Sequence, residues 1–522
     1  MRLSSILLVI AVLFTVGLST GAAAQATFEG TLKLGAIIFD EDAGDLSTVQ
    51  ETYNIEDGFS VSQIRLTGRL NPQNYFSLNL REVNLQSRKG ELVYRGPSRL
   101  RLKASFDQHR QVFDSDRAVT SERKDWRVGA QVTPAKWIRL SGYYNLQDRE
   151  GDRLSFPAGA VNQLGSQYDY MLQNWRAEAE LRKDGRALAV AYDYSSLTDD
   201  VDDITDRTGN IVSARLFTPD LFFDDKLTHM FRAAYGKHEV SNSDLDYTLT
   251  NFQYTGAIRP HDRFGLKYNY HANRIEDDAT GLQTDNFQNH FDATYYHLYG
   301  NLYGGYGYEI NDDDKTLTNY NVWRLGGSLN YKKRAKVNAA FTSRAKTADA
   351  DLTLLKDSEV DQFKAKVELR PTDDFAFGGR VHNRQRTYTD IDVEADGLLW
   401  NGFGAYEYPG WGGITGDFSY ITDDYKDLAG RFKTNTQLVT GRVHFDWLKN
   451  LRLVSGVTYM DIGEDLDIEK TIVFVEGTFT VLNDYHLEVK YNVYNYDDYI
   501  LIDRYYTANA VWINVAYDFR KE

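Results

Sequence analysis

Apolar and polar residues alternate one by one in segments of about ten residues from residue 26 to the end of the chain. In one such segment, Phe363, Ala365 and Val367 are separated by Lys364 and Lys366. An alternation of period two places one set of side chains on each face of a β-sheet. The pattern therefore predicts an all-β protein whose sheet has one apolar and one polar face.

The connections between these predicted strands are of two kinds, which alternate along the chain. Short turns contain Pro, Asn, Asp or Gly, as in 71–74, 133–136 and 370–373, and an aromatic residue or Leu often opens the next strand. The longer connections are mostly acidic, and residues 40–57 include seven acids and no Lys or Arg. Short turns at one end and long loops at the other are typical of outer-membrane barrels, whose short turns face the periplasm.

These features predict a large transmembrane antiparallel β-barrel of about 26 strands. Counting residues 91–95 as one short strand makes the number even and keeps the Pro-rich turns on one side. The final segment, 511–519, ends on aromatic residues, as is typical of bacterial barrels, although three more residues follow it. A soluble β-sandwich array or propeller also alternates, but few segments here are apolar on both faces and no blade repeat is visible.

The composition fits strands and turns rather than helices. The chain has 36 Tyr, 27 Phe and 40 Gly against 8 Pro and 4 Met. After the first twenty residues, no apolar run approaches the roughly 18 residues that a membrane helix needs. The sequence therefore excludes a helical membrane protein.

The first residues predict export from the cytoplasm. A positive charge precedes the apolar run 6–14, and small residues follow at Ala22 and Ala24, which predicts a signal peptide over residues 1–24 and a barrel over residues 25–522. The chain has no Cys and a formal net charge of −16. Such a chain fits a bacterial envelope protein and argues against a nucleic-acid partner.

Motifs for catalysis or metal binding are sparse. A Gly-x-Ser-x-Gly motif at 17–21 falls inside the predicted signal peptide, and no His-Glu-x-x-His, phosphate-loop or Cys-x-x-Cys-His motif occurs. We therefore expect no enzyme activity and no cofactor on this chain, and an outer-membrane hydrolase with a purely spatial triad is the weakest alternative. The acidic clusters 199–206 and 312–314 offer oxygen ligands for Ca²⁺, but solvated loop acids are the simpler interpretation.

Basic residues are abundant on the polar faces of the predicted strands. A basic wall in a confined lumen attracts anions or an acidic protein surface. An equally good interpretation is that these residues pair with acids on neighbouring strands, such as Glu178 and Glu180. The candidate residues that face the lumen or a partner are Arg65, Arg69, Arg81, Arg99, Arg101, Lys103, Arg127, Arg139, Arg176, Arg182, Arg380, Arg384 and Arg442.

The predicted barrel has no obvious filling. About 26 strands spaced ~4.8 Å apart and tilted by about 40° close to a circle of roughly 50 Å backbone diameter. The predicted strands and their connections use nearly all of the mature chain, so we expect no plug domain. A hole of this width must be flattened, filled by its own long loops, or occupied by another protein.

The chain resembles the MtrB/PioB family of outer-membrane porins. The signal peptide, the Cys-free Tyr-rich strands, the short Pro-Asx turns, the strand number and the missing plug carry the resemblance, together with segments such as 143–149 and 370–372. Some family members have a Cys-x-x-Cys near the mature N-terminus, which this chain lacks, and the chain is shorter than the longer members.

The resemblance implies an outer-membrane scaffold that sheathes a periplasmic multihaem c-type cytochrome and insulates an electron path, with an extracellular cytochrome as a second partner. The haems would belong to the partner, because a chain without Cys cannot attach them covalently. The alternative is a diffusion porin for anionic solutes in which the same Arg residues determine selectivity.

Overall fold

The computed structural model contains one 26-stranded antiparallel sheet that closes into a barrel. It describes residues 27–521 except 45–48, 50–52, 72, 115–118, 156–162, 202–205, 220–225, 242–245, 314–315, 350–356, 390–392, 428–429 and 500–504. The predicted signal peptide lies outside the described residues. No helix in the described part of the chain is long and apolar enough to cross a membrane.

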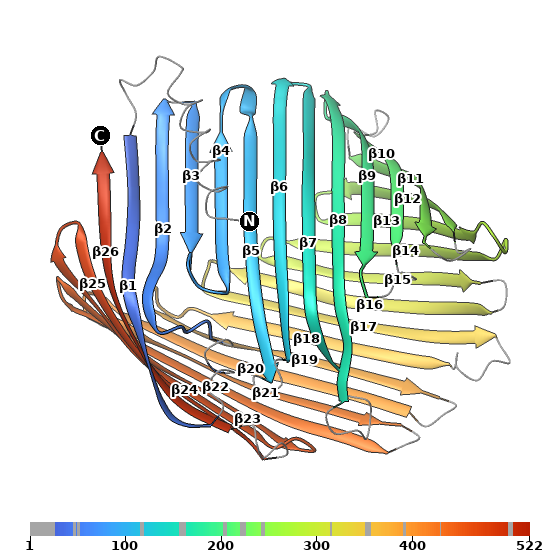
Figure 1. Ribbon diagram of the computed structural model, residues 1–522. Coiled ribbons are helices and arrows are strands. Elements are labelled where there is room, and N and C mark those ends of the chain that lie inside the picture. Colours follow the sequence, from blue (N-terminus) through green and yellow to red (C-terminus); the bar gives the residue numbers. More distant parts are fainter. Residues whose placement is uncertain are drawn as a thin grey trace.

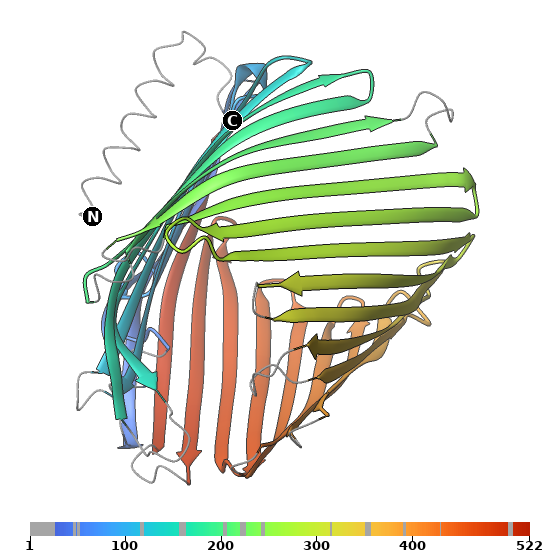
Figure 2. The same cartoon turned by 90° about the vertical axis from the view of Figure 1, so that its right-hand side faces the viewer.

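The strands follow one another around the wall in chain order (Figures 1 and 2). The first thirteen are β1 (Thr27–Gly44), β2 (Gly58–Asn71), β3 (Asn74–Arg81), β4 (Arg88–Arg95), β5 (Arg101–Asp114), β6 (Val119–Ala135), β7 (Ile138–Ser155), β8 (Gln163–Lys183), β9 (Arg186–Asp199), β10 (Arg207–Pro219), β11 (Leu227–Val240), β12 (Tyr247–His261) and β13 (Phe264–Asp277). The others are β14 (Gln283–His297), β15 (Gly300–Asp312), β16 (Leu317–Tyr331), β17 (Ala335–Asp349), β18 (Ser358–Leu369), β19 (Phe375–Tyr388), β20 (Val393–Tyr408), β21 (Gly412–Lys426), β22 (Arg431–Leu448), β23 (Leu451–Glu464), β24 (Ile468–Leu482), β25 (Tyr485–Asp498) and β26 (Tyr505–Lys521).

The first and last strands close the barrel. β1 pairs with β26 from Phe28 opposite Lys521 to Gly44 opposite Tyr506, and β1 also pairs with β2. In Figure 1 the blue β1 accordingly lies beside the red β26. The strand number, the antiparallel order and the short strand β4 confirm the predictions from the sequence.

The two kinds of connection also lie where the sequence predicted them. Turns after even-numbered strands are mostly short, as between Ala135 and Ile138 and between Leu448 and Leu451. The connection after β4 contains a single turn of 3-10 helix, Pro97–Arg99. Connections after odd-numbered strands include the longest ones, such as that between β1 and β2. The chain thus has a short-turn end and a loop end.

Ion pairs that skip one strand identify the inner face of the wall. Arg215 on β10 approaches Glu178 and Glu180 on β8 at 3.8 and 3.7 Å. The intervening strand β9 contributes only the small, buried Ala189 and Ala191 at the facing positions. Side chains two strands apart converge on a concave surface and diverge on a convex one. The polar face is therefore the lumen face.

The opposite face is apolar and carries many large exposed side chains. On three adjacent strands, Val190, Val212 and Tyr235 are 48%, 52% and 60% exposed. Exposed apolar surface of this extent is costly in water but matches the hydrocarbon region of a bilayer, where only backbones with internally satisfied hydrogen bonds are stable. A closed antiparallel barrel satisfies that requirement because no strand edge is left open.

The described part of the β1–β2 connection folds against the lumen face near the loop end. Val49 and Ile55 are fully buried there against Ile37, Ala508 and Ala510. Ile37 and Ala510 belong to the polar, inner face of β1 and β26 by register, which locates the contact inside the barrel. One of the three expected solutions, inward folding of a loop, is thus realised along this part of the wall.

Candidate functional site: the inner wall

Register places twelve of the thirteen candidate residues on the lumen face of strands. The exception is Arg99, which lies in the 3-10 turn between β4 and β5 with a positive φ of 56°. The polar and apolar alternation of the sequence begins at Arg99, before the strand does. Pro97 and Ser98 start a turn that includes Arg99, and β5 begins only at Arg101. Arg99 is therefore a residue of the short-turn rim rather than of the wall.

Three of the candidate arginines belong to an ion-pair network centred on Glu180. The carboxylate of Glu180 is 3% exposed and pairs with Arg182 on its own strand and with Arg139 Nη2 at 2.6 Å. Arg176 Nη2 lies 2.7 Å from Glu178, and its Nη1 lies 3.1 Å from Asp193. Four arginines, Arg215 included, are thus compensated by three acids on β8 and β9.

The sequence left open whether the wall cations are free to attract anions or are paired with acids on neighbouring strands. In this part of the wall they are paired. Arg139, Arg176 and Arg182 hold the sheet together rather than present free positive charge, because each one contacts a carboxylate. Lys103 likewise lies 3.2 Å from Glu91 on the neighbouring strand. Pairing therefore explains these four cations.

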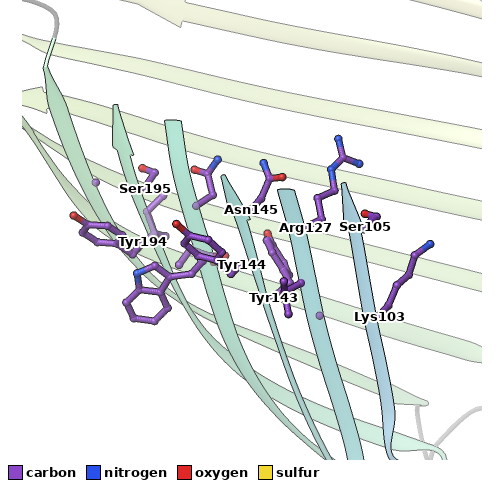
Figure 3. Close-up of a pocket in the computed structure, with 15 residues that line it drawn as sticks. Lys103, Ser105, Arg127, Tyr143, Tyr144, Asn145, Tyr194 and Ser195 are labelled. Atoms are coloured by element: carbon purple, nitrogen blue, oxygen red, sulfur yellow. The ribbon is translucent and has the colours of Figure 1, made fainter. Parts of the chain in front are cut away.

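The other wall candidates have no ion pair within 4.0 Å among the described residues, and all of them are exposed to the lumen. They are Arg65, Arg69, Arg81, Arg101, Arg127, Arg380, Arg384 and Arg442. Figure 3 shows Lys103, Arg127 and Asn145 extending from three adjacent strands on one side of the sheet, with Tyr144 and Tyr194 on the other side. These three polar residues line a depression in the wall.

A second network was not anticipated from the sequence. On β14 to β17, Arg344 Nη2 lies 2.5 Å from Glu309, His290 Nε2 lies 3.3 Å from the same carboxylate, and Arg324 Nη2 lies 3.1 Å from Asp292. Gly307 on β15 lies opposite His290, and a Cβ there would meet His290 Nδ1 at 2.1 Å. A glycine at that position leaves room for the imidazole. This cluster is compensated internally.

The inward-folded loop is held by aromatic contacts that the sequence analysis missed. The Tyr53 ring stacks on Tyr494 with 4.3 Å between centroids, and its hydroxyl lies 3.2 Å from that of Tyr506. Lys470 Nζ lies 5.1 Å from the centre of the Tyr53 ring, a cation–π distance. The signal in the sequence is the presence of apolar and aromatic residues, among them Val49, Tyr53 and Ile55, in a loop rich in acids.

Burial of Tyr53 raises the pKa of its phenol well above the ordinary value of 10, and the neighbouring Tyr506 adds to the effect. The docked loop thus binds the phenolic proton more tightly than the released loop does. Docking is favoured at every pH below 10 and weakens as the pH rises above 10, by up to about tenfold per pH unit.

We expect hydrogen–deuterium exchange of residues 53–57, corrected for intrinsic rates, to accelerate above pH 10. The variant Tyr53→Phe keeps the ring stack but removes one of the phenolic protons at the contact, so its step should be smaller, with Tyr494 and Tyr506 as the remaining phenols. Equal acceleration in both proteins would contradict the assignment to Tyr53.

The described residues contain no group of three or more His, Cys, Asp or Glu side chains arranged to hold a metal ion. Part of the acidic cluster 199–206 and one member of 312–314 lie outside the described residues. Whether the acids of these two loops bind Ca²⁺ or are simply solvated therefore remains a prediction from the sequence. The candidate site is the inner wall itself.

The closed barrel, its apolar outer face and the asymmetry of its two ends define an integral β-barrel protein of the bacterial outer membrane. No protein-family model matches the sequence, and no curated protein matches it.

Among solved structures, a complex of a variant of the ferric enterobactin receptor PfeA from Pseudomonas aeruginosa with enterobactin matches with a TM-score of 0.50 at 9% identity, over 84% of this chain and 87% of that chain. The siderophore receptor PirA from the same organism matches at 0.47 and 10% identity, over 83% and 87%. The FrpB iron transporter from Neisseria meningitidis matches at 0.48 and 11% identity, over 80% and 81%. At 9% identity, the similarity to PfeA shows a shared fold and nothing about function.

Proposed function

We propose that this protein is an outer-membrane scaffold that holds a periplasmic multihaem c-type cytochrome in its lumen and so supports electron transfer across the membrane. The observation that carries the proposal is a closed 26-stranded barrel with no helical plug among its described residues. Transporter barrels of about 22 strands hold a plug in their lumen. A wider barrel without one calls for an occupant.

The resemblance to the MtrB/PioB porins implies that the occupant is a multihaem c-type cytochrome. A lumen of roughly 50 Å backbone diameter leaves room for an elongated protein after the side chains are subtracted. The polar inner wall and the free arginines suit a water-soluble, acidic partner rather than a lipid. Charge-assisted hydrogen bonds from Arg to carboxylates, haem propionates included, are the strong interactions that such a contact would use.

The decisive experiment is gentle detergent extraction from the native membrane, followed by haem staining of whatever travels with the barrel. We expect a haem-bearing chain in near-equal amount, and a second one at the outer surface where an extracellular partner is present. Pure barrel that carries no haem and conducts ions freely in a planar bilayer would reject the proposal.

The unpaired arginines favour a second candidate, a diffusion channel for anionic solutes. Screening argues against it, because the Debye length at 0.1 M salt is about 10 Å, well below half of the bore. Ions near the axis would therefore feel little of the wall charge.

We accordingly expect Arg101→Gln combined with Arg127→Gln to change the chloride-to-potassium permeability ratio of the empty barrel by less than about twofold. Lys332→Gln with Lys333→Gln, in the short turn after β16, serves as the control. A larger change confined to the wall variant would favour the anion channel over the scaffold. The measurement is the reversal potential across a salt gradient.

A further inference from the structure

Four cations that form no ion pair among the described residues are arrayed on the lumen face of β18 and β19. Lys366 lies directly opposite Arg380, and Lys364 lies opposite His382, the residue next to Arg384 on the same face. We call Lys364, Lys366, Arg380 and Arg384 the basic ladder. The two lysines lie two residues apart on β18, and the two arginines lie four residues apart on β19. At ~3.3 Å per residue, the array is roughly 13 Å long.

Few acids lie on the lumen face around the basic ladder, and no ion pair joins one of them to a ladder cation among the described residues. By register, the residues opposite the two lysines on β17 are Ala340 and Asn338, and those opposite the two arginines on β20 are Asn401 and Gly397. Asp423 on the next strand, β21, lies beside Gly397 but forms no ion pair with Arg384 within 4.0 Å. Among the described residues of β18 and β19, the one lumen-facing acid is Glu368, which lies 2.8 Å from Arg370 and is also within electrostatic reach of Lys366. None of the four ladder cations has an ion pair within 4.0 Å among the described residues.

This arrangement costs stability in the empty barrel. Like charges directly opposite each other on neighbouring strands repel, whereas the network around Glu180 shows that this chain can place acids beside its lumen cations. All four ladder side chains are exposed and project from a nearly flat wall. They do not converge on a pocket that would fit one small anion.

We propose that the basic ladder is the contact through which the barrel binds an acidic face of the protein that fills its lumen. The proposal rests on the proposed function, because it assigns the residues that hold that occupant. An extended, exposed array matches a protein surface with several carboxylates better than a single solute, and each Arg can receive a carboxylate through two parallel hydrogen bonds.

The test compares two variants extracted from the native membrane. The ladder variant combines Lys364→Gln, Lys366→Gln, Arg380→Gln and Arg384→Gln. The matched control combines Lys136→Gln, Lys332→Gln, Lys333→Gln and Lys449→Gln, which removes four exposed cations of the short turns, outside the lumen wall. The readouts are haem per barrel at a series of salt concentrations and the unfolding midpoint of the haem-free barrel.

We expect the ladder variant to retain at least about tenfold less haem than the native barrel, and the control to lose much less. The haem-free ladder variant should be as stable as the native barrel or more so, since a repulsion has been removed. Unchanged haem retention, or an equal loss in the control, would overturn the ladder assignment while leaving the scaffold function intact. Native barrel without haem would instead reject the scaffold function, and a ladder variant that unfolds more easily would show a structural role for these residues.

Discussion

Replacing Ile55 by Ala should release the inward-folded loop from the wall. Ile55 is fully buried in the cluster formed with Ile37, Ala508 and Ala510, and truncating such a side chain costs about 3 kcal/mol. That loss corresponds to roughly a hundredfold change in the docking equilibrium. The loop contains Glu51 and Glu56 and no Lys or Arg, so cleavage by a glutamate-specific protease reports its release.

The matched control for this prediction is Leu282→Ala, which shortens an aliphatic side chain that is 44% exposed near the start of β14. Its cleavage pattern should equal that of the native barrel. The prediction is wrong if Ile55→Ala leaves the 40–57 segment as resistant as before. Retained resistance of the barrel strands distinguishes loop release from unfolding.

Removing the carboxylate of Glu180 should be the most destabilising single change in the wall of β7 to β10. Glu180→Ala leaves Arg139 and Arg182 without their shared partner in a crowded part of the lumen. The loss should be about 1–2 kcal/mol, less than for a fully buried pair, because Arg139 and Arg182 are 30% and 54% exposed and Arg139 keeps Glu178 at 3.5 Å. Urea unfolding in lipid, followed by tryptophan fluorescence, measures the loss.

Two further variants make the Glu180 result specific. Glu180→Gln preserves the shape and should lose less stability than Glu180→Ala. Asp373→Ala breaks a pair with Arg334 at 3.4 Å in which the aspartate is 96% exposed, so it should cost less than about 1 kcal/mol. Equal effects of the buried and exposed substitutions would contradict the network described here.

The architecture could be predicted from the sequence because its causes are local. Alternation fixes which side chains share a face, and Pro-Asx turns such as 370–373 mark where one strand ends and the next begins. The same turn sets the register of β18 and β19, so the pairing of Lys366 with Arg380 could have been predicted from the sequence. Arg99 was misplaced because alternation alone does not show where a strand starts.

The docked loop could not be predicted, because it depends on distant contacts. Tyr53 stacks on Tyr494, which follows it after more than twenty intervening strands, and no periodicity connects the two. The division of the wall arginines into paired and free ones depends in the same way on contacts across strands. Arg215 reaches Glu180 only because β9 has small residues between them.

The pairing of β1 with β26 also governs how the protein can be made. A partly delivered chain has two open strand edges, and each edge is a template for wrong pairing with another polypeptide. Because β26, a strand of seventeen residues, must arrive before β1 can complete its hydrogen bonds, the seam closes only after β26 has been exported. Until then both open edges must be kept from pairing with other polypeptides, and the interval is longer for a barrel of many strands than for one of few.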